Sequence, residues 1–562
     1  MTIDRRELRW AMAVAAVVMA LTCLPYIFGL FITPPGMQYM GFLGNPDDQN
    51  VYMAWMRQAA EGRILFTDLF TSEPQQAGFL HVYFLLLGLV ARLTHLPLIW
   101  TYHAARIIGG WLLLLVFYVF CAAFTERPAV RRLALLLAAF SSGLGWLFYF
   151  VLPPGSPHPA DFGRGLVMPE AVTFLTILLN PLFSFSMALM LATFLLAMLA
   201  AEKGSARLAL YAGILGLILG NAHTYDMVTV YAVLALYGVV LLACRNFRGV
   251  ALLALIVAVS SPSVAYQAWL FRANFIFRAK ALTPTLSPPF VMMLLTFGIP
   301  LALALPGAVM GLRSSQWRPV PGHPERPVRV AEGRRFSLPA IWVVIGFLLL
   351  AFAPFSFQRK LAEGLHLPIC LLAAVAVVSA LETRTLAKVL LIALTSLSNI
   401  FFVSRAAQDL ITNNAAHRNE LMPPLYLRQD EVATIRWLRP VPGHPERLVR
   451  VAEGRQETPP GSVILSSSLL GSYIPGLSGR RVYIGHWAET IDFQPKLSLA
   501  VRIFQSATPE NVRRALLERA GITHILYGPY ERDIGDWNPA ASGLTHLEYQ
   551  NDTVQVFSVR PM

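Results

Sequence analysis

Long apolar runs separated by short polar gaps dominate the chain up to about residue 403. Eleven of these runs come close to the length that a membrane-spanning helix needs, which is roughly 20 residues. They occupy residues 10–32, 97–124, 131–152, 182–201, 207–220, 227–244, 249–269, 289–311, 338–354, 361–381 and 386–403. The pattern therefore predicts an α-helical multi-pass membrane protein with about eleven transmembrane helices.

Residues 79–95 form one further apolar stretch, and its placement decides the orientation of every later loop. If the stretch lies in the membrane interface, the Lys and Arg residues of the short loops fall on the cytoplasmic side, as the positive-inside rule requires. The N-terminus is then cytoplasmic, and the chain after residue 403 lies outside. If the stretch spans the membrane, all later loops change sides. We favour the interfacial placement, and the spanning alternative stays open.

After about Leu425 the pattern changes to that of a soluble α/β unit. Short apolar runs at 462–465, 481–484 and 522–527 predict strands, residues 547–559 predict a hairpin, and 508–520 predict a helix. We therefore expect three parts: a transmembrane domain over 1–403 with a large outer loop at 33–96, a linker over 404–424, and an extracytoplasmic α/β domain over 425–562.

Composition and charge support a membrane protein. The chain is 56% hydrophobic and 14% charged, whereas a soluble protein has about 25% charged residues. The net charge of +13 comes from basic residues that cluster between apolar runs, so it indicates membrane orientation and no nucleic-acid partner. The cysteines lie inside apolar segments, so we expect neither a disulfide framework nor a cysteine metal cluster; they are Cys23, Cys121, Cys244 and Cys370.

A seventeen-residue sequence occurs twice, at 318–334 and 439–455, with Pro327 in one copy and Leu448 in the other. Two copies are too few for a solenoid, which needs about three stacked units. The predicted topology also puts the copies on opposite sides of the membrane. We interpret them as an inserted element in exposed loops, and assign no ligand role to His323 or His444.

Asp47 and Asp48 follow the first apolar run and are the first candidates for chemistry. Acidic side chains are costly near hydrocarbon, so a carboxylate pair there favours a functional site. Two neighbouring carboxylates can accept a proton from a hydroxyl, hold a divalent cation, or do both. The alternative is a solvated turn, because Asn-Pro-Asp-Asp is also good turn chemistry.

Three acidic or histidine side chains in later outer loops are further candidates. Glu170 would lie at the outer membrane boundary as a second acid or a metal partner, or simply as a favourable carboxylate near a helix N-terminus. His223 and Asp226 lie in a polar corner between two spans, where they would contact substrate. The alternative there is an ordinary capped turn, with Asp226 opening the next helix.

The remaining candidates are a pair of cations and a segment of the C-terminal region. Arg359 and Lys360 are adjacent at the outer end of a span and would bind a phosphate group, unless they only extend toward the headgroups. His486 and Glu489 follow a predicted strand end, where ligand-facing residues often lie. The alternative is that Trp487 packs there and its polar neighbours have no role.

These segments together resemble the GT-C superfamily of membrane glycosyltransferases, in the bacterial group related to protein mannosyltransferases and aminoarabinose transferases. The resemblance rests on the acidic pair in the first outer loop, the basic outer segment at 359–360, residues 169–174 (PEAVTF) and residues 472–490 (SYIPGLSGRRVYIGHWAET). The chain departs from the mannosyltransferases at 75–81, which lacks their His-Pro-Pro-type stretch.

The resemblance implies an enzyme that transfers a sugar from a polyprenyl-phosphate donor, with inversion, to a glycan, lipid or protein acceptor outside the cytoplasm. It implies that Asp47 or Asp48 is the general base and that Arg359 and Lys360 stabilise the departing lipid phosphate. Alternatively, Asp47 or Asp48 holds a divalent cation, magnesium or manganese; if neither does, the resemblance implies no cofactor. The expected location is the inner or plasma membrane of a bacterial cell envelope, in contact with membrane lipids.

Two other functions are alternatives to the glycosyltransferase. A transporter or flippase for a lipid or polysaccharide would move its cargo without covalent chemistry and would favour charges deep within spans. A scaffold would use residues 425–562 to bind a cell-surface polymer. The glycosyltransferase hypothesis makes the sharpest structural prediction, which is that the early acidic pair and Arg359–Lys360 converge on one cavity at the outer leaflet.

Overall fold

The computed structural model describes residues 3–147, 168–313, 316–320, 323–330, 333–413, 423–439 and 461–560. The chain divides into two compact units. Unit 1 comprises Met1–Leu24, His103–Trp269 and Pro284–Arg405, and unit 2 comprises Pro25–Tyr102, Leu270–Thr283 and Ala406–Met562. The predicted domain boundaries at 403 and 425 stay a prediction.

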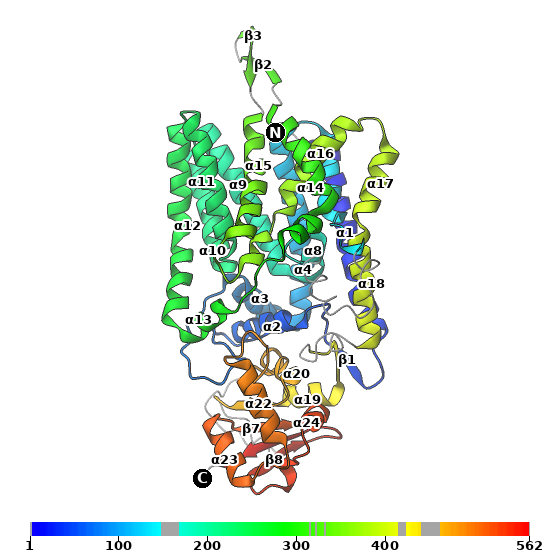
Figure 1. Ribbon diagram of the computed structural model, residues 1–562, viewed down its shortest axis with the longest axis vertical. Helices are drawn as coiled ribbons and strands as arrows, with labels where there is room; N and C mark the ends of the chain where they lie inside the picture. The colour runs from blue at the N-terminus through cyan, green and yellow to red at the C-terminus, as the bar shows by residue number, and fades with distance from the viewer. Residues whose placement is uncertain are drawn as a thin grey trace. The chain divides into compact units, whose positions relative to one another are not determined.

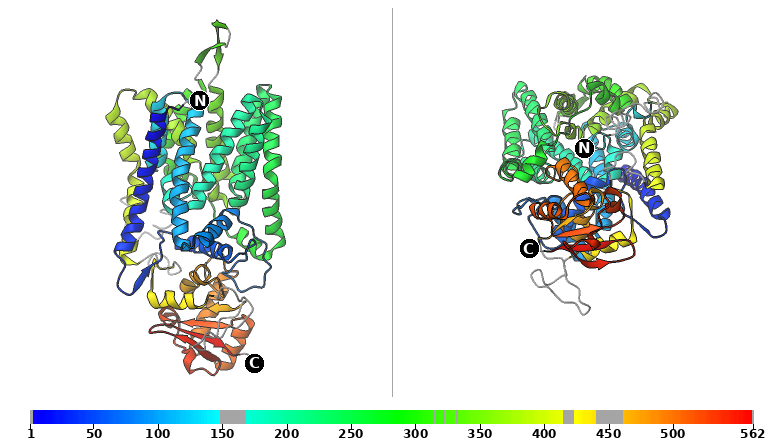
Figure 2. Two further views of the ribbon diagram at one scale, coloured as in Figure 1. Left: turned by 180° about the vertical axis from the view of Figure 1, so that it is seen from behind. Right: turned by 60° about the horizontal axis from the view of Figure 1, so that its bottom comes forward.

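Unit 1 is a helical bundle (Figure 1). An element that crosses the division between the units belongs to the unit that holds most of its residues. The elements of unit 1 are α1 (Arg5–Phe31), α4 (Leu98–Phe124), α5 (Pro128–Phe140), α8 (Thr173–Leu179), α9 (Pro181–Lys203), α10 (Ala206–Ala222), α11 (Asp226–Ala243), α12 (Phe247–Ala273), α14 (Phe290–Arg313), the hairpin β2 (Gln316–Val320) and β3 (His323–Val330), α15 (Gly333–Phe352), the 3₁₀ helix η1 (Gln358–Ala362), α16 (His366–Ala380), α17 (Thr385–Thr395) and α18 (Leu397–Thr412). Helices α9 to α12 lie side by side in Figure 1 and again in the view from behind (Figure 2).

Within the described residues, ten helices are long and apolar enough to cross a membrane. They match ten of the eleven predicted runs, and the multi-pass helical fold is confirmed. The eleventh run is α10, a 17-residue apolar helix. The stretch at 79–95 forms α3 (Val82–Thr94), whose 13 residues reach only about 20 Å, against a hydrocarbon core of about 30 Å. That length disfavours the spanning alternative, and the interfacial placement stays a prediction.

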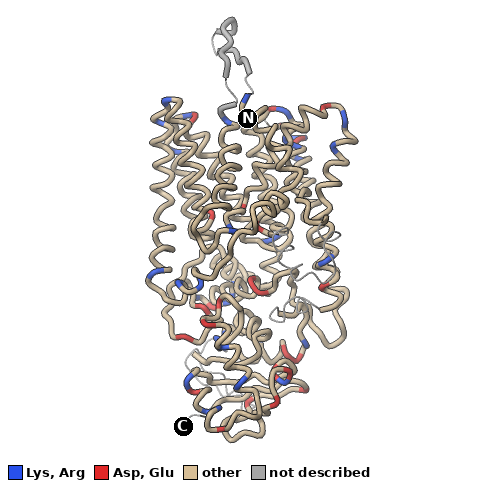
Figure 3. Tube along the Cα trace, viewed as in Figure 1, with Lys and Arg blue, Asp and Glu red and all other residues tan. Residues whose placement is uncertain are grey.

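The bundle is organised around α16. The span Gln358–Ala380 has 94% of its apolar window buried, far more than any other candidate span, so it lies at the centre of unit 1. Helices α5, α14 and α15 pack against it. Along the unit-1 helices charged residues gather mostly toward the helix ends (Figure 3), as expected when the middle of each helix faces lipid or other helices.

One buried ion pair ties the N-terminal helix to α5. The guanidinium of Arg131 contacts both carboxylate oxygens of Glu7, with Nε 2.8 Å from Oε1 and Nη2 2.8 Å from Oε2. The hydroxyl of Tyr118 donates to the same carboxylate. Both charged side chains are only 3% exposed. Arg131, which the sequence pattern presents as a loop charge, therefore also fixes two helices together.

Unit 2 joins the first long loop of the chain to the C-terminal region. Its helices are α2 (Pro46–Ala60), α3 (Val82–Thr94), α13 (Phe275–Leu282), α19 (Gln429–Trp437), α20 (Ser468–Gly471), α21 (Ile474–Ser478), α22 (Phe493–Phe504), α23 (Glu510–Arg519), α24 (Pro529–Ile534) and the 3₁₀ helix η3 (Pro539–Ala541). Strands β1 (Met37–Tyr39) and β4 (Tyr426–Arg428) pair antiparallel across these two parts of the sequence.

Close backbone packing holds the loop segments of unit 2 in place. Helix α2 packs against α3 and α21. A Cβ atom on Gly88 of α3 would lie 2.5 Å from the carbonyl oxygen of Met56 in α2, so only glycine allows this approach. The backbone N–H of Val482 donates to the carbonyl of Leu69 at 2.9 Å. The early loop and the C-terminal region therefore form one structure.

The C-terminal sheet confirms the predicted α/β region. Its five strands run in the order β6 (Arg481–Val482), β5 (Val463–Leu465), β7 (His524–Tyr527), β9 (Gln555–Val559) and β8 (Thr545–Gln550). The first three are mutually parallel, and β9 pairs antiparallel with β7 and β8. All the predicted strands and the hairpin are present. The predicted helix at 508–520 is α23, which begins at Glu510.

Two predicted features fall wholly or partly outside the described residues. The outer loop at 153–170 is described only from Met168, so Glu170 is its described candidate. Of the repeated element, the copy at 318–334 contributes to the β2–β3 hairpin. The copy at 439–455 lies beyond the described residues from position 440 onward.

Candidate functional site

Polar residues from two parts of the sequence meet in unit 1. His223 follows the last residue of α10, and Asp226 is the first residue of α11. Nδ1 of His223 lies 3.1 Å from Oδ2 of Asp226 and 3.3 Å from Oε2 of Glu363, which lies between η1 and α16. All three side chains are buried.

Two cations adjoin this group. Nη2 of Arg359 donates to Oε1 of Glu170 at 3.3 Å. The ammonium of Lys360 lies 4.5 Å from the ring centroid of Tyr225, in the same corner as His223. The charges of Glu170 and Lys360 also act on the Glu363 carboxylate.

We call these six residues the unit-1 cluster: Glu170, His223, Asp226, Arg359, Lys360 and Glu363. The sequence predicted all of them except Glu363. In the structure the predicted phosphate-binding cations come together with the predicted acids and histidine of the later loops. At the corner 223–226 the imidazole faces a third buried acid, and its role in substrate contact stays a prediction.

Asp47 and Asp48 open helix α2 in unit 2. Pro46 occupies the first turn with them, and carboxylates are favourable at a helix N-terminus. Nδ2 of Asn45 donates to Oδ2 of Asp48 at 2.7 Å. The Asp48 side chain remains 55% exposed, whereas Asp47 is buried. The two carboxylates are therefore adjacent in sequence but differ sharply in environment.

His486 brings the C-terminal region to this pair. Its Nδ1 accepts hydrogen bonds from the backbone N–H groups of Ala488, at 3.0 Å, and Glu489, at 3.2 Å. The neutral imidazole must then carry its proton on Nε2. That nitrogen lies 3.5 Å from Oδ1 of Asp48. The loop at 485–490 thus fixes the tautomer that faces the acidic pair.

Burial gives Asp47 the properties of a base. It raises the pKa of Asp47 to about 6, with the charge of His486 lowering it and the charge of Asp48 raising it. A catalytic base works best when its pKa lies near the working pH. Asp47 meets that condition.

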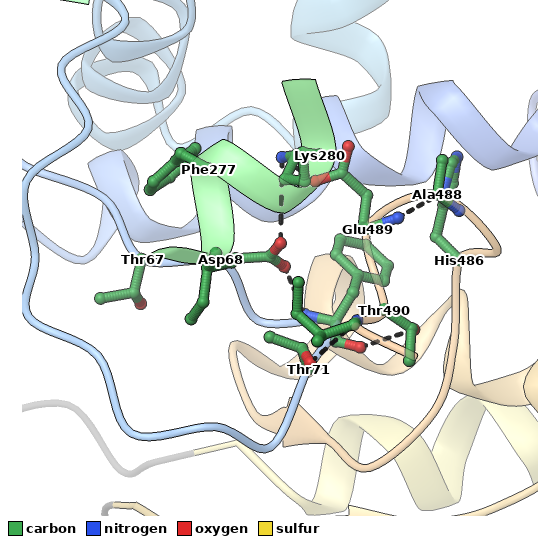
Figure 4. A network of polar contacts seen from close by, with 12 residues as sticks. Thr67, Asp68, Thr71, Phe277, Lys280, His486, Ala488, Glu489 and Thr490 are labelled. Atoms are coloured by element: carbon green, nitrogen blue, oxygen red, sulfur yellow. Dashed lines mark hydrogen bonds and ion pairs between the residues drawn. The ribbon is translucent and has the colours of Figure 1, made fainter. Parts of the chain in front are cut away.

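A second acidic position lies nearby in unit 2 (Figure 4). Lys280 forms ion pairs with Asp68, at 3.8 Å, and with Glu489. Burial raises the pKa of Asp68 to about 7; Lys280 lowers it, and Glu489 raises it. Thr490 links this loop back to the early segment, because its hydroxyl donates to the carbonyl of Phe70 at 2.8 Å.

We call the second group the unit-2 cluster: Asp47, Asp48, Asp68, Lys280, His486 and Glu489. The sequence predicted four of its members. Trp487 is 49% exposed, and a role for its polar neighbours stays a prediction. Asp68 and Lys280 were missed. The available signal was a charge next to apolar residues: Lys280 follows the span at 249–269, and Asp68 lies between phenylalanines at 66 and 70.

The structure distributes the predicted residues over two clusters, one in each unit. Glu170, Arg359 and Lys360 fall in unit 1, and Asp47 and Asp48 fall in unit 2. The predicted convergence of the acidic pair with Arg359–Lys360 therefore stays a prediction.

Binding of a divalent cation by the acidic pair stays a prediction. Both oxygens of Asp48 already face partners, Asn45 and His486. Among the described residues, a group of three possible metal ligands lies elsewhere, at His223, Asp226 and Glu363. Their ligand atoms lie within 4.8 Å of one another. The chemistry derived for Asp47 and Asp48 below accordingly uses no metal.

Comparison with known proteins identifies the fold. No protein-family model and no curated protein matches the chain. Solved structures do match. The oligosaccharyltransferase AglB of Archaeoglobus fulgidus, in complex with an inhibitory peptide and a dolichol-phosphate, aligns over 92% of this chain and 69% of its own, with 11% identity and a TM-score of 0.51. The zinc and sulfate complex of the Archaeoglobus fulgidus oligosaccharyltransferase aligns over 92% and 68%, with 12% identity and a TM-score of 0.53.

The arabinofuranosyltransferase AftD from mycobacteria aligns over the whole chain but over 40% of its own length, with 13% identity and a TM-score of 0.52. At such low identity these similarities establish the fold. The architecture that the sequence predicts, a multi-pass helical bundle followed by a sheet-containing region, is confirmed.

Proposed function

We propose that the chain is an integral membrane glycosyltransferase that moves a sugar from a polyprenyl-phosphate donor to an acceptor outside the cytoplasm. The observation that carries the proposal is the buried carboxylate of Asp47, whose pKa is raised to about 6 beside His486. The fold supports it, because the similar solved proteins are an oligosaccharyltransferase with bound dolichol-phosphate and an arabinofuranosyltransferase.

Asp47 acts as the general base. The acceptor hydroxyl attacks the anomeric carbon of the sugar while its proton passes to the Asp47 carboxylate. The bond between the anomeric carbon and the phosphate oxygen breaks, and its electron pair leaves with the lipid phosphate. Attack opposite the leaving group inverts the anomeric configuration. The charges of Asp48 and His486 set the electrostatic environment of the Asp47 carboxylate.

Arg359 and Lys360 stabilise the phosphate as its charge grows. Nε of Arg359 is buried and has no hydrogen-bond partner among the described residues, so it is available to a phosphate oxygen. Glu170 holds the other end of the guanidinium through Nη2. A preorganised cation lowers the barrier because it need not reorganise as the bond breaks.

The proposal includes an orientation. The N-terminus is cytoplasmic, and unit 2, with Asp47 and the C-terminal sheet, is extracytoplasmic. The membrane is the inner or plasma membrane, and the acceptor is a glycan, lipid or protein. The experiment below separates sugar transfer from the activity of a flippase.

The test uses the full chain in liposomes with a polyprenyl-phosphate donor labelled in its sugar and a membrane extract as the acceptor source. We expect Asp47→Asn to lower transfer by at least about a hundredfold, the scale of general-base catalysis. The matched control is Asp552→Asn, which removes an exposed carboxylate from a loop far along the chain and should transfer like the wild type. Full activity in Asp47→Asn, Asp48→Asn and the double variant would refute the mechanism.

Arg359→Met provides a separate test of the phosphate role. We expect it to lower transfer and to weaken inhibition by free polyprenyl phosphate, because both depend on binding the same group. Glu202→Gln is the control, since its carboxylate pairs with Arg335 at 2.7 Å outside the unit-1 cluster. Unchanged inhibition in Arg359→Met would remove Arg359 from the proposal.

A further inference from the structure

We propose that His223, Asp226 and Glu363 bind a divalent metal ion of the zinc class inside unit 1. One imidazole nitrogen and two carboxylates supply ligand atoms that all lie within 4.8 Å of one another. The three residues come from the end of α10, the start of α11 and the segment before α16. The proposal does not depend on the sugar-transfer reaction.

The ligand atoms face one another without forming hydrogen bonds. Nδ1 of His223, Oδ2 of Asp226 and both carboxylate oxygens of Glu363 are buried and have no hydrogen-bond partner among the described residues. Buried polar atoms normally have partners, and leaving several orphaned at one point is costly. A metal ion accepts lone pairs from all of them at once, which a hydrogen-bond donor of this size cannot do.

The charges balance for a divalent ion. A neutral imidazole with two carboxylates carries two negative charges in a buried place, where charge needs compensation. The charge of Lys360 acts on Glu363, and a divalent ion would balance both carboxylates at their ligand atoms. A protonated His223 would cancel only one of the two charges. It would also donate a hydrogen bond from Nδ1, yet neither carboxylate oxygen accepts one there although they lie 3.1 and 3.3 Å away.

The backbone holds the ligands in place before any ion arrives. The N–H of Glu363 donates to the carbonyl of Lys360 at 3.2 Å, and the next residue, Gly364, has φ +77°. A Cβ on Gly364 would lie 3.0 Å from Cζ2 of Trp342, so the turn beside Glu363 favours glycine. Rings of Phe183 and Tyr225 lie 5.4 Å from the His223 ring and restrict its rotation.

The donor set selects the kind of metal. One histidine nitrogen with two carboxylate oxygens suits zinc and its neighbours in the transition series, whereas magnesium and calcium prefer oxygen alone. Three protein ligands leave the fourth position of a tetrahedral zinc ion for water or a substrate atom, as in catalytic zinc sites.

The decisive experiment measures metal on the purified full chain. The protein is stripped with a chelator, incubated with zinc, passed over a gel-filtration column and analysed by mass spectrometry. We expect about one zinc ion per chain, and an X-ray absorption spectrum with nitrogen and oxygen ligands at about 2.0–2.2 Å and no sulfur. Cobalt substitution should give the visible absorption of a tetrahedral site. These measurements need no variant.

Variants then locate the ion. Glu363→Gln, Asp226→Asn and His223→Gln should each weaken zinc binding by more than about tenfold, since even loss of a residue that only supports a ligand has that effect. Glu202→Gln and His546→Gln are the controls, because they remove a carboxylate and an exposed histidine elsewhere and should bind zinc like the wild type. Stoichiometric zinc in all three ligand variants, a sulfur-containing shell, or no zinc on the wild type would each overturn the proposal.

Because the readout is metal content, it separates from the proposed function. Zinc binding with no sugar transfer would leave this site standing and count against the transferase. Sugar transfer by a chain that binds no zinc would support the transferase and count against the metal site.

Discussion

Replacing Asp47 with Asn should remove activity and, above about pH 6, stabilise the fold. Burial raises the pKa of Asp47 from 3.8 to about 6 in the folded chain. Between these two values the folded protein binds more protons than the unfolded chain, so stability falls as the pH rises. The difference of about two pKa units corresponds to about 3 kcal/mol. Asn carries no charge, so the Asp47→Asn variant does not lose this stability. In the wild type the loss is complete above about pH 6.

The same pKa fixes the pH profile of transfer. The base must be ionised to accept a proton, so activity should fall as the pH drops through about 6. Asp47 is about 90% ionised at pH 7 and about 10% ionised at pH 5, which predicts about a ninefold decrease in kcat/KM. An unperturbed aspartate would show almost no change over this interval.

Two assays on one set of samples check both consequences. Transfer of labelled sugar is followed from about pH 5 to pH 8, and thermal unfolding of wild type and Asp47→Asn is measured over the same range. We expect the wild type to lose activity below about pH 6, and the stability gap to widen up to that pH and then level off. A flat wild-type activity profile, together with an Asp47→Asn variant that is less stable than the wild type at about pH 8, would refute the reasoning.

Two further predictions concern buried charges. Glu7→Gln leaves the guanidinium of Arg131 buried without its counter-charge and should destabilise unit 1 by about 3–5 kcal/mol, measured by thermal unfolding in detergent; a change below about 1 kcal/mol would show that the pair is solvated. Lys280→Met removes the cation that lowers the pKa of Asp68. The variant should lose most stability at alkaline pH and recover part of it as the pH falls and Asp68 takes up a proton; a loss that does not depend on pH would contradict the ion pair.

The sequence predicted well what depends on local pattern. Apolar runs identified the helices that can span a membrane, and short β-branched runs identified β5, β7 and the β8–β9 hairpin. These features follow from periodicity and turn residues within a few positions of one another. The number of spanning helices depends on α10, because this helix is shorter than the other spans.

The sequence predicted less well what depends on distant partners. Glu363 lies only four residues from Arg359, yet its role emerges only when α10 and α11 bring His223 and Asp226 against it. Lys280 lies in a short basic segment after an apolar run, and its partners lie about 210 positions away in each direction at Asp68 and Glu489. No pattern within one segment encodes such contacts.

The difference between Asp47 and Asp48 also came only from the structure. The sequence presents two adjacent carboxylates with equal claims to be the base. In the first turn of α2, successive side chains point about 100° apart, so Asp47 turns inward and Asp48 faces solvent and His486. Helix geometry thereby assigns one of the pair a perturbed pKa.

The measurement that tests the central claim most directly is the balance between sugar and lipid phosphate. Liposomes containing the chain are supplied with polyprenyl-monophosphate donors carrying a panel of hexoses and pentoses, and both products are counted. The account predicts one free polyprenyl phosphate for each sugar that reaches the acceptor, and no release by Asp47→Asn. Movement of intact donor across the bilayer with no free polyprenyl phosphate from any donor would contradict it.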